Sequence, residues 1–259
     1  MRIFLYIFLF ISLNSFADKV IIHNIKTGDS ENTVKVYISN DYLKIENSML
    51  SMTIYRNEQY IQLLFHTGEV SWQGKFDDFN KGYKDYAEIL AHNTNETISD
   101  KQMNDIYSNI DSSLMIINTD TFVKTLSQIT YKKAFMKKSV LEYKCIVMKV
   151  KQDSKPIGNI LLTGDITRNS IIEIHLAMSV FNKFNAIFDF TTLKSFDYLN
   201  SLKYYAYPMK FVDNNNYSEE VIAIEDKNLG SQDFNMNKNY PQVSLPNLIE
   251  VIQTTKDRN

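Results

Sequence analysis

The residue types that most often carry chemistry are few and scattered in this chain of 259 residues. The four histidines are His23, His66, His92 and His175, and no two stand at a spacing typical of metal ligation. A zinc site needs histidine, cysteine or carboxylate ligands that converge on one point. We therefore predict no metal site. His175 lies on an apolar helical stripe and is interpreted as a core or rim residue. His66 ends a strand before a tight turn, which predicts exposure to solvent.

Two pairs of carboxylates are adjacent in sequence, Asp77-Asp78 and Glu219-Glu220. Glycosidase chemistry needs two carboxylates on opposite sides of a cleft, which neighbours on one element do not supply. Asp77-Asp78 instead fits the preference for acids in the first turn of a helix. The sequence also lacks a G-x-S-x-G elbow, a glycine-rich phosphate loop and an H-E-x-x-H motif. We predict no catalytic residues and no cofactor.

The single cysteine, Cys145, lies in the apolar segment EYKCIVMKV. A lone cysteine cannot form a disulfide within the chain. Its surroundings favour a buried thiol that packs as a small hydrophobic group. A disulfide to another molecule is the alternative.

The first 17 residues have the pattern of a secretory signal peptide. One basic residue, Arg2, precedes an apolar run from Ile3 to Ile11, and the small-x-small triplet Ser15-Phe16-Ala17 follows. The alternative is a membrane anchor, but the run is shorter than the roughly 20 residues that span a bilayer. We expect an exported protein of the periplasm, with secretion from the cell as the alternative, and a single domain over residues 18–259.

Composition limits the partners of the chain. The net charge is −2, with 44% hydrophobic and 13% aromatic residues. A nearly neutral chain has no overall basic field for nucleic acid or anionic lipid. We therefore expect no nucleic-acid partner and no stable membrane insertion once the signal peptide is removed.

Residues 33–72 read as a meander of short strands. Apolar and polar side chains alternate through TVKVYIS, DYLKIEN, SMTIYR, QYIQLLFH and EVSW. This period of two is typical of strands with one buried face. The short connections require antiparallel neighbours, since parallel strands need long crossovers.

The rest of the chain alternates between helical and strand patterns. A strand is predicted over residues 18–26 and a terminal hairpin over 207–212 and 217–226. Helices are predicted over 75–93, from 99 to 110, over 171–202 and over 245–252. Three further strands are predicted between 127 and 166, and the middle one, 141–152, is apolar on both faces, which predicts a central strand covered on both sides. This order predicts an α+β fold with a curved antiparallel sheet whose concave face is covered by helices.

Three segments together resemble the DUF4412 family of exported bacterial proteins, which is similar in fold to the LolA/LolB lipoprotein carriers. They are VYISNDYLKIENSMLSMTIYRNEQYIQLL; Val140–Cys145 with the hairpin to Leu162; and Ser231-x-x-Phe234 with Asn239-Tyr240-Pro241 and Val243-Ser244-Leu245. Two positions depart from the family pattern: Glu142 stands where glycine is usual, and Lys44 where arginine is frequent.

The resemblance implies a half-open barrel sheet with helices over its concave side. Members of the superfamily carry lipid or lipidated chains in that hollow. The resemblance transfers no catalytic residues, and fold alone does not fix function.

The apolar side chains of the meander and of one helical stripe are the candidate lining of such a hollow. They are Val36, Ile45, Ile54, Leu63, Phe65, Trp72, Phe181 and Phe184. Three hypotheses follow. The first is a non-enzymatic protein that binds a lipid-like or apolar ligand between sheet and helices. The second is a filled scaffold that acts through its surface on an envelope protein partner. The third is a hydrolase, which would need a polar cleft with converging histidine and carboxylates.

Overall fold

The computed structural model describes residues 18–55, 60–93, 129–166, 193–199, 206–234 and 239–256. The predicted signal peptide, the predicted helix from 99 to 110 and most of the helical stretch 171–202 lie outside these residues. Phe181, Phe184, His175 and the side chain of His92 are also outside the described part of the chain.

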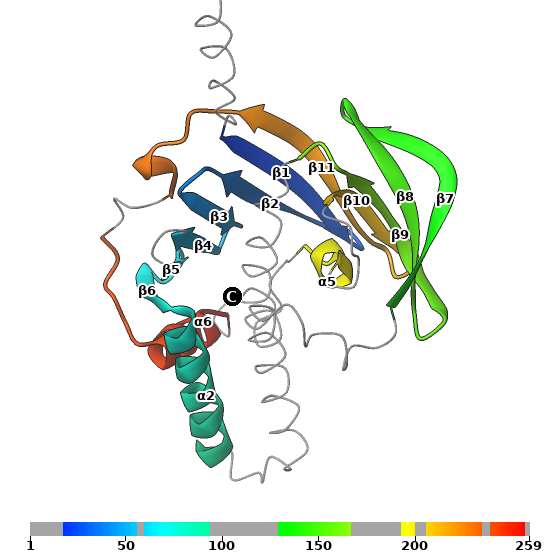
Figure 1. The fold of residues 1–259 in the computed structure, drawn as a ribbon. Coiled ribbons are helices and arrows are strands. Elements are labelled where there is room, and N and C mark those ends of the chain that lie inside the picture. Colours follow the sequence, from blue (N-terminus) through cyan, green and yellow to red (C-terminus); the bar gives the residue numbers. More distant parts are fainter. Residues whose placement is uncertain are drawn as a thin grey trace, which may run out of the picture.

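One antiparallel sheet of eleven strands dominates the described structure, in the order β6-β5-β4-β3-β2-β1-β11-β10-β9-β8-β7. The sheet is strongly curved and not closed, with β6 and β7 as its two edges (Figure 1). It joins two meanders through the pairing of β1 with β11. The strands are β1 Lys19–Thr27, β2 Ser30–Ile38, β3 Tyr42–Glu46, β4 Leu50–Tyr55, β5 Tyr60–Phe65, β6 Val70–Lys75, β7 Ile129–Val140, β8 Tyr143–Gln152, β9 Lys155–Thr163, β10 Tyr207–Asp213 and β11 Tyr217–Asp226.

The first meander confirms the strand pattern of residues 33–72. Its turns are built by short polar side chains that hydrogen-bond to nearby backbone groups, as such residues favour. The Asn47 side chain accepts hydrogen bonds from the backbone N–H groups of Met49 and Leu50, at 2.9 and 2.8 Å. These turns keep consecutive strands adjacent, so the alternating apolar side chains of all five gather on one face.

The second meander corrects one prediction. β8 is not a central strand covered on both sides but the neighbour of the edge strand β7. Ile146 is 41% exposed, and Lys144 and Lys149 are also exposed. Cys145, Val147, Met148 and Val150 are buried, so apolar residues at both alternating sets of positions along β8 are covered in part. The predicted central position was wrong, and no described element covers Ile146.

The described residues form three α-helices, of which the short one at 195–199 lies inside the curve of the sheet, while the other two pack together at its β6 end (Figure 1). They are α2 Phe76–Asn93, α5 Ser195–Leu199 and α6 Leu245–Lys256, the last longer than the predicted 245–252. Asp77 and Asp78 lie in the first turn of α2, as predicted, and Asp78 accepts a hydrogen bond from the Lys75 backbone N–H at 2.9 Å. None of the described helices is long and apolar enough to cross a bilayer.

The opposite, convex face of β1–β3 is covered by a short 3₁₀ helix, η1 Ser231–Phe234. Phe234 packs there on Val20 and Tyr37. The Lys44 ammonium lies beneath this segment, 3% exposed. It donates to the Asp233 carbonyl at 2.8 Å and lies 2.6 Å from the Glu46 carboxylate. The buried ammonium is tolerated because these two oxygen partners replace the hydrogen bonds to water that it loses on burial.

The two edges of the sheet differ. At β6, Ser71 pairs with residues on either side of Gln242: its N–H donates to the Pro241 carbonyl and its carbonyl accepts from the Val243 N–H, at 2.9 and 2.8 Å. This covering protects the edge from pairing with other chains. At β7, no strand of the described residues pairs with the outer edge.

Gly158 tests the packing of the second meander. A Cβ at this position would lie 2.1 Å from the Val212 carbonyl oxygen on β10, whereas a Cβ at Gly164 would meet nothing within 4 Å. We expect Gly158→Ala to lower the free energy of unfolding by more than about 2 kcal/mol, because backbone must move to relieve the clash. Gly164→Ala is the matched control, expected within about 0.5 kcal/mol of the wild type. Urea denaturation of both variants measures this, and equal losses would contradict the packing described.

Candidate functional site

Five apolar side chains form a continuous row across β2–β6. The register places Val36 opposite Ile45, Ile45 opposite Met52, Met52 opposite Leu63 and Leu63 opposite Trp72. Residues directly opposite each other in antiparallel strands point to the same face. The row therefore crosses the concave face from strand to strand.

All six predicted hollow residues of the described chain lie on this face. Ile54 is two positions from Met52 on β4, and Phe65 is two positions from Leu63 on β5, so both share the face of the row. The six are 0–6% exposed and belong to one apolar cluster. Met52 was not among the predicted lining residues. The alternation of apolar side chains along its strand would have placed it on the same face as Ile45 and Leu63.

The helices α2 and α6 contribute to the same cluster. The Trp72 ring meets the Phe79 ring of α2 edge to face, with centroids 5.7 Å apart, and Phe79 stacks on Tyr83 at 6.3 Å. Leu248 and Ile249 of α6 are fully buried in it. The aromatic side chains thus sit between helix and sheet at the β6 end of the concave face.

A second, polar group of side chains lies near the middle of the concave face, on β1, β10 and β11. The His23 imidazole Nε2 and the Tyr207 hydroxyl are 2.7 Å apart, and both side chains are fully buried. Burial raises the pKa of Tyr207 well above its ordinary value, and the nearby Glu219 carboxylate adds to this effect. Burial alone lowers the pKa of His23 to about 3, so the imidazole is neutral at physiological pH.

The Glu219 carboxylate lies below α5 in the same region, 1% exposed. It accepts hydrogen bonds from the Tyr217 hydroxyl at 2.7 Å and from the Ser195 backbone N–H at 3.3 Å. The Lys194 ammonium lies 4.3 Å from the centre of the Tyr217 ring. A buried carboxylate needs such compensation, and here it ties α5 to the sheet.

The side chains of the adjacent residues Glu219 and Glu220 lie on opposite faces of the sheet. Alternation along β11 puts Glu220 on the other face, where it lies 2.5 Å from the Lys210 ammonium. The fold also brings His23 and Glu219 onto neighbouring strands, a convergence that the sequence did not reveal. Both side chains are buried, so neither meets a substrate from solvent in this conformation.

The structure also shows how far Cys145 and His66 are buried. Cys145 is buried as predicted, and burial raises the pKa of its thiol. The prediction that His66 is exposed was wrong in degree: it is half-buried, because the segment that covers β6 brings Tyr240 against its ring at 6.3 Å. Within the described ranges, no three histidine, cysteine or carboxylate side chains are grouped as metal ligands.

Comparisons with known proteins assign no family. No family model and no curated protein matches the chain. Two solved structures of PNGF-II, in space groups C2 and P21, match at 10% identity with TM-scores of 0.42 and 0.41. They cover 92% of this chain and 33% and 34% of their own, so the chain spans about a third of the length of PNGF-II.

A further solved structure, of an uncharacterised conserved protein from Thermus thermophilus, matches at 7% identity and a TM-score of 0.40. It covers 88% of this chain and 90% of that protein. Similarities this weak support neither a shared fold nor a shared activity.

The buried imidazole predicts a specific dependence of stability on pH. The pKa of His23 is lower in the folded chain, about 3, than its ordinary value of 6.5. The unfolded chain therefore binds the extra proton first, so stability is retained above pH 6.5 and lost progressively as the pH falls toward 3. Between pH 7 and 5 this one group should cost about 2 kcal/mol of unfolding free energy.

His23→Gln removes the titration and keeps a polar partner for Tyr207. We expect its unfolding free energy to fall less steeply than that of the wild type between pH 7 and 5, measured by urea denaturation at each pH. Parallel curves for the two proteins would show that the imidazole is already accessible to protons in the folded state.

Proposed function

We propose that this chain is a non-enzymatic protein of the cell envelope that binds a lipid-like or otherwise apolar ligand between the concave face of the sheet and the helices. The signal-peptide pattern of residues 1–17 supports export, with the periplasm as the proposed destination and secretion as the alternative. The observation that carries the proposal is the row from Val36 to Trp72, which gives the concave face an unbroken apolar surface across five strands.

The chemistry of this face suits an apolar ligand. Ligand sites are concave and mainly apolar, with a few polar groups that fix orientation. The apolar row and the phenyl ring of Phe79 would contact hydrocarbon. The His23–Tyr207 and Tyr217–Glu219 hydrogen bonds lie on the same face further along the sheet and supply the polar groups. Met52, unbranched and adaptable, lies in the middle of the row.

The proposal extends the resemblance to the DUF4412 family and the LolA/LolB carriers. An open, curved antiparallel sheet with α5 inside its curve and α2 and α6 at its β6 end is compatible with a half-barrel of that type. The resemblance favours a carried lipid or lipidated chain as the ligand.

A filled scaffold that acts through its surface is the second candidate. The specific observation in its favour is the complete burial of Val36, Ile45 and Leu63, as in a core packed to native density. The two candidates differ in what occupies the space above the row: a removable ligand or the protein's own side chains.

Native mass spectrometry of the protein purified from cell envelopes tests the proposal directly. We expect a population carrying additional mass that disappears after organic extraction and returns on incubation with fatty acid. A single apo mass together with no uptake of a fluorescent fatty acid would exclude the ligand-binding proposal.

A pair of matched variants separates the two candidates. Val36→Phe enlarges a side chain of the concave row, and Val20→Phe enlarges one packed on Phe234 at the convex face. Overpacking a filled core costs about 1–3 kcal/mol. With a displaceable ligand above the row, Val36→Phe should keep its stability within about 0.5 kcal/mol in the lipid-free state and lose ligand uptake, while Val20→Phe is destabilised and keeps uptake. Equal destabilisation of both would favour the scaffold.

A further inference from the structure

The hairpin formed by β7 and β8 carries a concentrated positive charge that the net charge of the chain conceals. Residues 129–152 contain seven lysines and one acidic residue, Glu142, in a chain whose overall charge is −2. Within the described part of the chain none of these lysines has an ion pair. Lys132 lies directly opposite Lys149, and like charges in that position are destabilising. The hairpin therefore provides a local basic field.

The same hairpin carries an unusual amount of exposed apolar surface. Phe135 is fully exposed, Met136 is 62% exposed, and Leu141 and Ile146 are about half exposed. Isolated exposed hydrophobic side chains are ordinary, but a cluster ringed by charge marks an interaction site. In the described residues the other exposed large hydrophobic side chains are Val212 and Ile222, on β10 and β11.

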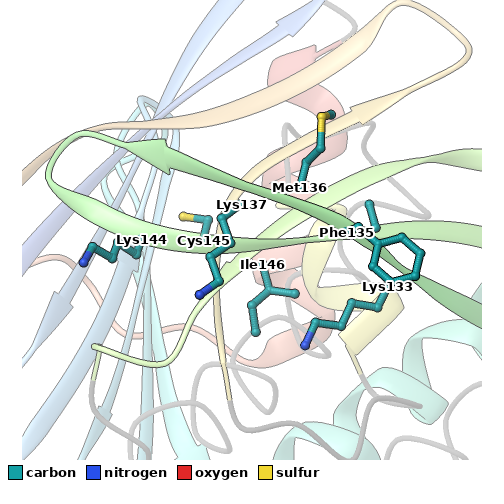
Figure 2. Close-up of a pocket in the computed structure, with 8 residues that line it drawn as sticks. Lys133, Phe135, Met136, Lys137, Lys144, Cys145 and Ile146 are labelled. Carbon is teal, nitrogen blue, oxygen red and sulfur yellow. The ribbon is translucent and has the colours of Figure 1, made fainter.

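A bulge in β7 accounts for the exposure of Phe135 and Met136. Lys133 pairs with Met148 and Lys137 with Ile146, so three residues of β7, from Ala134 to Met136, stand opposite Val147 alone. The bulge pushes these residues out of the ladder. Beside it lies a hollow of about 640 Å³, lined by Lys133, Ala134, Phe135, Met136, Lys137, Lys144, Cys145 and Ile146. Figure 2 shows Lys133, Lys137 and Ile146 on one side of the two strands and Met136 on the other.

We propose that the β7–β8 hairpin is a membrane-docking surface that binds the anionic headgroup region of a phospholipid bilayer. The lysines would contact headgroup phosphates, and Phe135 and Met136 would enter the boundary between headgroups and acyl chains. Aromatic and aliphatic side chains beside lysines are the composition of surfaces that lie in that boundary. This inference does not rest on the proposed ligand of the concave face.

Charge complementarity and edge geometry favour a bilayer over a partner strand. Lysines and a bulge on an edge strand oppose strand addition, since they disrupt the row of backbone groups that a partner would use. Protection against aggregation alone does not explain why the bulge exposes Phe135, because an exposed aromatic side chain favours association. A bilayer needs no backbone pairing and accepts both the charge and the apolar side chains.

Vesicle flotation tests the proposal with purified full-length protein. The vesicles are made of phosphatidylcholine alone or with 30 mol% phosphatidylglycerol. We expect binding to the anionic vesicles, weakened as salt rises, and little binding to the neutral ones. All variants share the same residues 1–17, so any contribution of that apolar segment is common to them.

Two double variants test the role of charge. Each lysine near an anionic surface contributes about fivefold to partitioning, so Lys133→Gln with Lys137→Gln should weaken binding to anionic vesicles about 25-fold. Lys26→Gln with Lys81→Gln removes two exposed lysines outside the hairpin and should leave binding unchanged. An equal effect of both pairs, or binding of the wild type that ignores the lipid charge, would overturn the proposal.

A tryptophan placed at position 135 reports whether the bulge of β7 enters the bilayer. The emission of the wild type, which comes from Trp72 alone, is recorded with and without vesicles and subtracted. Phe135→Trp should show a blue-shifted emission on addition of anionic vesicles, whereas Ile222→Trp, also exposed to solvent in the unbound protein but on β11, should not shift. Absence of a shift at position 135, or a protein partner that captures the hairpin while vesicles do not bind, would overturn membrane docking. Neither outcome bears on ligand uptake at the concave face, so the two proposals fail separately.

Discussion

The pairing of β1 with β11 is the contact on which the rest of the structure depends. It joins residues about 200 positions apart in sequence, from Lys19 opposite Asp226 to Thr27 opposite Tyr217, and so fuses two meanders into one sheet. Each meander alone can form from local contacts, but closing so long a loop has an entropic cost that the β1–β11 ladder and its side chains must offset. A bulge between Ile22 and His23 adjusts the register at this seam.

The seam also organises the concave face. On its β2–β6 side the row from Val36 to Trp72 is entirely apolar, and on its β10–β11 side lie the buried Tyr207 and Glu219. His23, on β1 itself, reaches Tyr207 across the intervening strand. The face therefore combines a hydrocarbon surface with oriented polar groups, which is the basis for proposing that it receives an amphiphilic ligand.

The sequence was informative where the controlling interactions are local. Alternation along residues 33–72 predicted the five strands and the common face of Val36, Ile45, Ile54, Leu63, Phe65 and Trp72, and the step to a period near 3.6 predicted α2. It could not predict the β1–β11 pairing, so the contact of His23 with Tyr207 and the place of Glu219 under α5 were not foreseen. The apolar run around Ile146 was misread because periodicity does not reveal which strand ends a sheet. Net charge likewise hid the basic hairpin, since acidic residues elsewhere balance it.

The most direct measurement of the central claim uses Trp72, the only tryptophan of the chain and the last member of the apolar row. Bromine atoms quench indole fluorescence at contact, so a fatty acid brominated along its chain reports on ligand beside this ring. We expect saturable quenching that the unbrominated fatty acid reverses. Emission from Trp72 that stays unchanged while the brominated fatty acid is present in excess would contradict an apolar ligand site on the concave face.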